Sequence, residues 1–505
     1  MFSHLFKTKN LNALLHESEE PQHQLKRSLG SFDLTMLGIG AIIGTGIFAV
    51  VGTAAAGGAE HLGAGPGVMI SFIITAVACA FCALCYAEFA SMVPISGSAY
   101  TYSYATLGEL VAWIIGWDLI IEYAIGNVAV AIPWAAYFHQ LLEGLGVHLP
   151  AWIAVDFRSA MQAGNKVFHE GAAISPDIAL AYEAYLHHPT IFGIPIIFNF
   201  LAAGIVAFIT WILVLGIKES ARVNNIMVIL KVAILLFFII VGANYVKPEH
   251  WTPFFPNGLQ GVWTAASLIF FAFIGFDAIS TTAEECRNPS RDLPRGILWS
   301  LAICTVIYIA TAGVLTGIIP WNQLGVADPL AAALAYLNLD WAAGIVAFGA
   351  VIAMTAVILV FQMGQPRIFF AMSRDGLLPK TFSKVHPKYK TPHVTTIWTG
   401  VVVAIFSGVA NLNEIVELTN IGTLFAFVLV CAGVLILRKK EPNRPRAFKT
   451  PLVPLVPLLG IASCIYLMLG LPWVTWFRFG IWLLLGAAIY FFYGFRKSKL
   501  KEKFE

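Results

Sequence analysis

The sequence predicts an all-α integral membrane protein with twelve transmembrane helices. The 505 residues are 58% hydrophobic and 12% charged, and the mean hydropathy is +0.78. A soluble domain carries about 25% charged residues, and folding this chain in water would leave large apolar patches exposed. Disordered, collagen-like and disulfide-scaffold classes are excluded by composition. The net charge of +3, with basic residues spread along the chain, gives no indication of nucleic-acid binding.

Apolar runs that follow Phe32 supply the predicted spans, each with about the ~20 residues that a bilayer-crossing helix needs. They lie at 33–53, 67–91, 109–141, 192–216, 222–246, 261–283, 296–318, 341–371, 393–410, 415–437, 452–471 and 475–494. With the N-terminus in the cytoplasm, most clusters of Lys and Arg fall on the cytoplasmic side, as the positive-inside rule requires. We therefore expect a multi-pass protein of the plasma (inner) membrane, surrounded by lipid, with both termini cytoplasmic.

Several catalytic and energy-coupling motifs are missing from the sequence. It contains no Gly-Lys dipeptide and hence no Walker A loop for ATP, and it has no Gly-x-Ser-x-Gly or His-Glu-x-x-His motif. We expect neither an enzyme nor a bound cofactor. Cys79, Cys82 and Cys85 lie in span 2 without a histidine beside them, so we interpret them as packing residues and predict no metal site.

Glycines are concentrated in the middle of span 1, in the stretch Gly40-Ala-Ile-Ile-Gly-Thr-Gly46. Glycine at this density weakens a helix. One interpretation is a broken helix, whose second half begins near Gly44 and leaves the N–H groups of Gly44, Thr45 and Gly46 free to bind an anion. The other is close packing against neighbouring helices through small residues. Span 1 alone does not decide between them.

Span 6 favours the broken-helix interpretation. It contains Phe270-Phe-Ala-Phe-Ile-Gly-Phe-Asp277, with a glycine and an acid between aromatic residues near its middle. Interruptions in spans 1 and 6 are typical of transporters built from an inverted repeat, here spans 1–5 and 6–10, with the substrate at the bilayer midplane. Such a site offers N–H groups to a carboxylate and carbonyl groups to an ammonium. This is the chemistry of an amino acid backbone.

Four motifs resemble a known family. Gly-Ala-Ile-Ile-Gly-Thr-Gly-Ile-Phe (40–48) is similar to the span-1 motif of the amino acid–polyamine–organocation (APC) superfamily. The other three stretches are Tyr86-Ala-Glu-Phe-Ala…Pro94-Ile-Ser-Gly-Ser-Ala-Tyr-Thr-Tyr102, Phe273-Ile-Gly-Phe-Asp…Glu285-Cys-Arg-Asn-Pro289 and Gln365-Pro-Arg-Ile-Phe…Pro379. The last two resemble the cationic amino acid transporter family, whose animal members have fourteen spans. The resemblance implies a LeuT-like fold that works by alternating access.

The apolar runs and the basic clusters divide the chain into a cytoplasmic tail (1–32), a ten-helix transport core (33–438) with an extracellular insertion (147–190), a cytoplasmic loop (439–451), two further spans (452–494) and a second tail (495–505). The resemblance implies roles for individual residues. Ile43, Gly44, Thr45 and Gly46 would meet the substrate carboxylate, and the carbonyls near Ile42, Phe271, Ala272 and Ile274 would meet its amine. Phe271 would close over the substrate, and Met354 would line the side-chain end of the pocket. The insertion receives no role.

Ionisable side chains inside a membrane are functional candidates by default, because burying their charge is costly. Lys231 in span 5, Glu122 in span 3 and Asp277 in span 6 qualify as proton-coupling candidates. For each, a structural role remains the alternative: snorkelling for Lys231, pairing with Asp118 for Glu122 and helix capping for Asp277. Glu88, near the end of span 2, is expected to form a structural salt bridge.

The leading functional hypothesis is a secondary active transporter that imports an amino acid with a proton. An amino acid exchanger or uniporter is the alternative within transport. A sensor that binds an amino acid without moving it is the alternative from another class. The sequence leaves open whether the substrate is a small neutral or a cationic amino acid.

Overall fold

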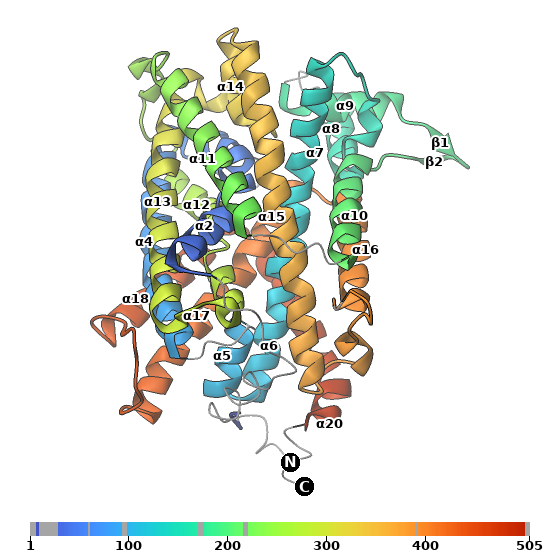
Figure 1. Ribbon diagram of the computed structural model, residues 1–505. Helices are drawn as coiled ribbons and strands as arrows, with labels where there is room; N and C mark the ends of the chain where they lie inside the picture. The colour runs from blue at the N-terminus through green and yellow to red at the C-terminus, as the bar shows by residue number, and fades with distance from the viewer. Residues whose placement is uncertain are drawn as a thin grey trace.

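The computed structural model describes residues 7–9, 29–58, 61–92, 98–169, 176–215, 221–389 and 391–499. These residues form an elongated bundle in which long helices run side by side (Figure 1). Within them the fold is all-helical apart from a two-stranded hairpin, β1 (Thr190–Ile191) with β2 (Ile194–Pro195). The all-α prediction is therefore confirmed.

The α-helices run as follows: α2 Ser31–Ile42, α3 Val51–Ala56, α4 Val68–Met92, α5 Ser98–Thr106, α6 Glu109–Ile120, α7 Gly126–Gly144, α8 Phe157–His169, α9 Pro176–His187, α10 Phe200–Leu215, α11 Ala221–Ala243, α12 Gly258–Ile269, α13 Pro289–Ile318, α14 Pro329–Tyr336, α15 Asp340–Arg374, α16 His393–Val409, α17 Leu412–Lys440, α18 Leu455–Met468, α19 Trp473–Ile489 and α20 Phe495–Lys497. Short 3-10 turns span Gly65–Gly67 (η2), Ala151–Ile153 (η4), Pro248–Trp251 (η5), Phe270–Phe273 (η6), Asp277–Glu285 (η7), Trp321–Gln323 (η8) and Lys380–Ser383 (η9). Three π-helical turns span Gly46–Val50 (η1), Ile121–Ile125 (η3) and Tyr490–Gly494 (η10).

Within the described residues, eight helices are long and apolar enough to cross a membrane, and the pair Ser31–Ile42 and Gly46–Ala56, bent by 40°, makes a ninth candidate. Three apolar helices are shorter: α10, α16 and α18. Each predicted span overlaps one of these twelve. The fourth begins later than predicted, at Phe200 instead of 192, because Gly193 and Pro195 fall in the hairpin.

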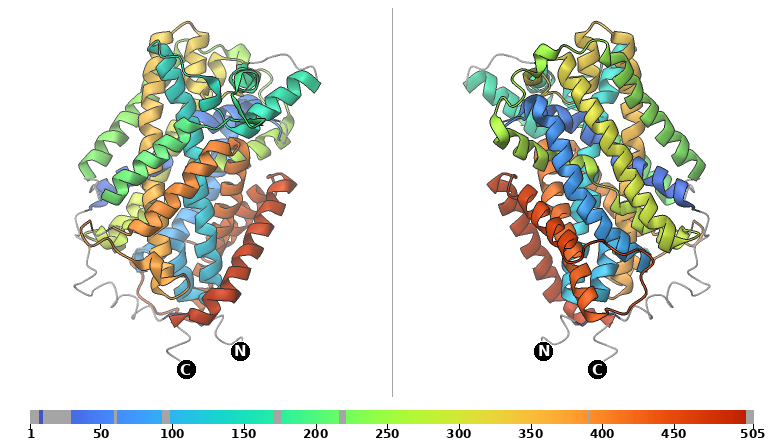
Figure 2. Two further views of the ribbon diagram at one scale, coloured as in Figure 1. Left: turned by 90° about the vertical axis from the view of Figure 1, so that its right-hand side faces the viewer. Right: turned by 90° about the vertical axis from the view of Figure 1, so that its left-hand side faces the viewer.

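The exterior of the bundle is apolar where the long helices face outward. Trp211 on α10, Trp398 on α16 and Phe477 on α19 are all more than half exposed. The interior is packed with apolar side chains from nearly every helix. Figure 2 shows α18 and α19 along one flank of the bundle. An apolar exterior around an apolar interior is the arrangement of a protein solvated by lipid.

The two ends of the described chain meet at Asp375, which follows α15. Lys9 Nζ lies 3.2 Å from Asp375 Oδ1, and the backbone N–H of Lys499 donates to the Asp375 carbonyl at 3.1 Å. Tyr100 donates its hydroxyl to Asp375 Oδ2 at 2.7 Å. The N-terminal and C-terminal segments are therefore on the same side of the bundle.

Glu88, at the end of α4, is the centre of a buried ion-pair network. Arg438 donates to both of its carboxylate oxygens at 2.8 Å, Arg446 donates to Oε1 at 3.1 Å, and the Thr450 N–H donates to Oε2 at 2.8 Å. The Glu88 side chain is 1% exposed. It thus holds the segment that follows α17 against α4, which confirms the predicted structural salt bridge.

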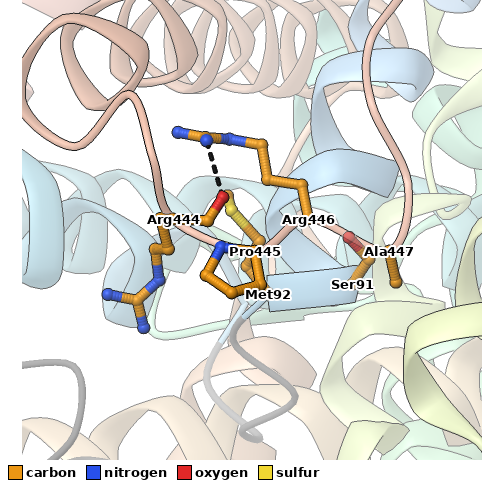
Figure 3. A pocket seen from close by; sticks show the side chains of 6 residues that line it. All are labelled: Ser91, Met92, Arg444, Pro445, Arg446 and Ala447. Carbon is orange, nitrogen blue, oxygen red and sulfur yellow. Dashed lines mark hydrogen bonds between the residues drawn. The ribbon is translucent and has the colours of Figure 1, made fainter.

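An open cavity of about 580 Å³ lies beside this network, lined by Ser91, Met92, Arg444, Pro445, Arg446 and Ala447 (Figure 3). The dashed line in Figure 3 marks Arg446 donating to the Arg444 carbonyl at 2.9 Å. None of the residues predicted to bind substrate lines this cavity, so it is not the predicted site.

Removing the Glu88 carboxylate should destabilise the fold strongly. Glu88→Ala leaves Arg446, which is 2% exposed, and Arg438 without their anion, and breaking a buried pair from one side costs about 3–5 kcal/mol. Glu441→Ala is the matched control, because Glu441 pairs with Arg444 but is 45% exposed and such pairs contribute about 0–1 kcal/mol. Thermal unfolding of the purified variants in detergent should show a large loss only for Glu88→Ala. Equal unfolding midpoints would contradict the assignment.

Candidate functional site

The first predicted span is broken where its glycines lie. α2 ends at Ile42, and the π-helical turn η1 starts the second half at Gly46. The Gly44 carbonyl accepts from the N–H groups of Ile47 and Phe48, both at 3.3 Å, so it provides the first backbone acceptor of the second half. The break thus falls where the sequence predicted it.

Side chains from two neighbouring helices satisfy the carbonyl groups that the break leaves without helical partners. Lys231 on α11 donates through Nζ to the Gly40 carbonyl at 2.6 Å and to the Ile43 carbonyl at 3.0 Å. Tyr308 on α13 donates its hydroxyl to the Ile42 carbonyl at 2.9 Å. Lys231 is fully buried, and its ammonium lies at the negative end of the α2 dipole, where a cation is favoured.

The N–H groups at the start of the second half-helix, unlike these carbonyl groups, receive no partner from a neighbouring helix among the described residues. Among the described residues, none of the backbone hydrogen bonds at the break uses the N–H of Gly44, Thr45 or Gly46 as its donor. These N–H groups lie at the N-terminus of the second half-helix, which is the positive end of its dipole. The predicted break therefore leaves these three N–H groups without a backbone acceptor among the described residues.

The sixth predicted span is also interrupted. α12 ends at Ile269, η6 follows over Phe270–Phe273, and η7 starts at Asp277. Between them Gly275 has a φ of 119°, which residues with a Cβ rarely adopt. The side-chain amide of Asn420 on α17 donates to the carbonyls of Ser267 and Leu268, both at 2.9 Å. The end of α12 is therefore capped from a neighbouring helix, as α2 is.

The two interruptions face each other. A Cβ added to Gly46 would overlap the backbone of Ala272, and a Cβ added to Gly275 would lie 3.0 Å from the backbone of Ala41. Glycine at both positions lets the two broken spans touch backbone to backbone. The structure thus brings the predicted residues Ile42, Ile43, Gly44, Thr45 and Gly46 together with Phe271, Ala272 and Ile274.

Helix α15 closes a third side of this region. A Cβ on Gly44 would lie 2.9 Å from Cγ2 of Val357. Met354 is fully buried one turn earlier on the same helix. Residues three apart lie on one face of a helix, so Met354 is on the side of α15 that faces the span-1 break.

The three membrane-buried charges separate into two groups. Lys231 contacts the span-1 break, whereas Glu122 and Asp277 are buried elsewhere, and each has a carboxyl oxygen without a hydrogen-bond partner among the described residues. Tyr123 donates its hydroxyl to Asp277 Oδ2 at 3.3 Å. Tyr123 directly follows Glu122, so its bond places Glu122 and Asp277 in the same region of the interior. The predicted pairing of Glu122 with Asp118 is not seen among the described residues: neither carboxyl oxygen of Asp118 has a hydrogen-bond partner, and Asp118 lies against Gly422 on α17.

Several contributors to this region were not predicted from the sequence. Tyr308, Tyr123 and Asn420 bond to its backbone or carboxyl groups, yet an isolated Tyr or Asn in an apolar span gives no specific signal. The π-helical turns η1 and η3 were also missed, and such turns are frequent at functional sites. Among the cysteines, Cys82 packs with Cys464 and Cys431 at Sγ–Sγ distances of 3.3 and 3.9 Å.

Comparison with known proteins gives a consistent result. The amino acid permease family model matches residues 29–494. A branched-chain amino acid permease of Bacillus subtilis (strain 168) is 50% identical over 499 residues, 99% of each chain. A methylthioribose transporter of the same organism is 46% identical over 501 residues, 99% of this chain and 100% of the relative. A vacuolar cationic amino acid transporter of Arabidopsis thaliana is 35% identical over 445 residues, 87% and 68% of the two chains.

Gly46→Ala should abolish solute uptake by the reconstituted protein. The methyl group would overlap the Ala272 backbone and separate the two interruptions. Gly344→Ala on α15 is the matched control, because a Cβ there meets nothing within 4 Å. Both variants should reach the membrane in similar amounts, as judged by immunoblot, and only the first should lose uptake. Normal uptake by Gly46→Ala would show that transport does not require this close contact between the two interruptions.

Proposed function

The chain belongs to the amino acid permease family, and we propose that it is a secondary active transporter that imports an amino acid together with a proton. The family match confirms the resemblance to the APC superfamily that the motifs indicated. Its relatives are permeases and transporters, not enzymes, so the chain is a multi-pass membrane transport protein. The observation that carries the proposal is the contact between the two interruptions at Gly46 and Ala272.

The proposed architecture has twelve spans: a LeuT-like core of two five-helix repeats, 33–438, followed by two further helices, 452–494. The eight long helices, the bent pair and the three shorter apolar helices together supply twelve candidates. The meeting of both chain ends at Asp375 supports an even number of crossings, because an odd number would put the ends on opposite sides. The excess of basic residues on that side favours a cytoplasmic location for both ends in the plasma membrane.

In the proposed site, the substrate carboxylate binds the N–H groups of Gly44, Thr45 and Gly46, with Ile43 beside them. The substrate ammonium binds carbonyl groups near Ile42, Phe271, Ala272 and Ile274. The Ile42 carbonyl already accepts from Tyr308, and the Phe271 carbonyl accepts from Ile274 N–H at 3.4 Å. A carbonyl oxygen has two lone pairs, so each keeps capacity for a second donor. Phe271 closes the site from one side.

A neutral, apolar amino acid is the proposed substrate class. Met354 and Val357 on α15 are apolar and buried, and they lie where the substrate side chain would extend. The 50% identical relative is a branched-chain amino acid permease, which supports the same class. The 46% identical relative, a methylthioribose transporter, makes a thioether sugar the second candidate. Such a sugar has neither the carboxylate nor the ammonium that the two interruptions address.

Competition for uptake separates these candidates. With the protein in liposomes and radiolabelled leucine as tracer, free α-amino acids with apolar side chains should compete. Leucine methyl ester, isoamylamine and methylthioribose should not, because each lacks one or both of the charged groups. Equal competition by isoamylamine would contradict the anion site. Uptake of methylthioribose without leucine uptake would replace the amino acid proposal with the sugar.

Lys231 is the proposed coupling residue. Its bonds to the Gly40 and Ile43 carbonyls hold the first half of span 1 in place. Loss of a proton would weaken these bonds and free that half-helix to move, which links proton transfer to opening of one side. A fixed ammonium there also repels a second cation, by several kcal/mol at short range in a protein interior, so sodium coupling is disfavoured. The buried carboxyl groups of Glu122 and Asp277 are the second candidates for the proton.

Lys231→Ala should uncouple transport from the proton gradient. Wild-type uptake should rise as external pH falls from about 8 to about 5, without sodium dependence. The variant should lose uphill accumulation but keep exchange of internal for external substrate, because the substrate groups are unchanged. Lys247→Ala, at an exposed lysine that follows the same helix, is the control. If Lys231→Ala still accumulates substrate like wild type, the proton is carried elsewhere and Glu122→Gln and Asp277→Asn become the next variants.

A further inference from the structure

A two-stranded hairpin leaves the helical bundle sideways just before α10 (Figure 1). β1 and β2 pair antiparallel, with Thr190 opposite Pro195 and Ile191 opposite Ile194. The two-residue loop between them has φ values of 52° at Phe192 and 77° at Gly193. Positive φ at both loop residues is the combination of a type I′ turn, where Asn, Asp and Gly are strongly preferred.

Phenylalanine is unfavourable in this turn for two separate reasons. A bulky residue at positive φ is a conformational outlier. The Phe192 side chain is also 100% exposed, so its large apolar surface is in contact with nothing in the described chain. A Cβ added to Gly193 would likewise meet nothing within 4 Å. Neither cost is offset inside the molecule, which indicates that the ring is covered by something outside it.

The stem of the hairpin is fixed at the edge of the apolar belt. The Phe198 N–H donates to the Trp152 carbonyl at 3.1 Å, and the Asn199 N–H donates to the Gly408 carbonyl at 3.0 Å. Gly408 is the penultimate residue of α16, and a Cβ there would overlap the Phe198 ring. The stem is therefore attached where α16 ends and where α10 begins, at Phe200.

The surface beside the hairpin is the one that faces lipid. α10 exposes Phe208 and Trp211, and α16 exposes Trp398 and Ile405, each more than half. No Asp, Glu, Lys or Arg occurs from residue 189 to 217, which covers both strands and all of α10. A protein partner in water would be expected to meet a polar rim around the apolar contact. Aromatic residues at the edge of an apolar belt are instead typical of the membrane interface.

We propose that the hairpin tip is a lipid-contact site, with the Phe192 ring inserted at the boundary between headgroups and acyl chains. The leaflet is the one opposite the side where the two chain ends meet at Asp375. This hairpin follows the 147–190 segment, and the contact anchors that segment against the membrane. The inference does not depend on which solute is transported.

Spin labelling of the full-length protein in liposomes of phosphatidylethanolamine and phosphatidylglycerol tests this inference. All seven native cysteines are buried, so a label attached to Phe192→Cys should react selectively, and unmodified protein treated in parallel measures the background. His148→Cys is the matched control, because His148 is exposed in the loop that follows α7 at the same end of the bundle. The label at 192 should collide more with oxygen than with a water-soluble nickel chelate, and the label at 148 should show the reverse.

Photo-crosslinking then identifies what covers the ring. Benzoylphenylalanine in place of Phe192 keeps an aromatic side chain, and its excited ketone inserts into a nearby C–H bond. Mass spectrometry should find phospholipid adducts at 192 and none at 148. In the crosslinking experiment, a covalent dimer at 192 would mean that a second copy covers the tip. In the spin-label experiment, equal accessibility to nickel at 192 and 148 would mean that the tip is in water. Either result overturns the proposal.

Discussion

A peptide group inside a bilayer has no water to bond to, so any interruption of a spanning helix must be satisfied by other parts of the protein. This constraint governs the arrangement around α2 and α12. The carbonyls released by the first break accept from Lys231 and Tyr308, and those at the end of α12 accept from Asn420. Three different helices, α11, α13 and α17, therefore each contribute a side chain that satisfies one of the two interruptions. The interior of the bundle is organised around broken backbone, although most of its volume is apolar packing.

The same constraint makes the N–H groups of the first break candidates for binding a ligand, because buried N–H groups need an acceptor. Unlike the carbonyl groups, they receive no protein partner within the described residues. Positive half-helix ends attract anions, and the backbone of Ala272 in the second interruption lies directly against Gly46. Glycine at 46 and 275 is required because the two backbones approach too closely for a Cβ.

The sequence predicted the spans and the position of the breaks because both depend on strong local signals. Apolar runs of membrane length identify the helices, and glycine clusters identify where a helix is weakest. It did not predict Tyr308, Tyr123 or Asn420, because their roles arise only when distant spans pack. The contact of the span-3 residue Tyr123 with Asp277 was missed for a related reason: the sequence offers only neighbours on the same helix, such as Asp118 at (i, i+4) from Glu122, and not a partner on another span. The late start of α10 was missed because the hairpin residues are as apolar as a span.

The positions of the ionisable groups suggest how proton and substrate sites are connected. Lys231 bonds to Gly40 and Ile43, directly before the free N–H groups of the first break. Asp277 begins the segment that follows the second break, and its hydrogen-bond partner Tyr123 is next to Glu122 in a π-helical turn of another span. Each break therefore has an ionisable group beside it. Lys231 is hydrogen-bonded to the backbone of the first break, and Asp277 belongs to the segment that follows the second. Movement of either segment changes the hydrogen bonds of that group, and a change in its protonation changes the restraint on that segment. The proposed coupling needs no long chain of intermediates, because the proposed proton-carrying groups and the proposed substrate site lie at the same two interruptions.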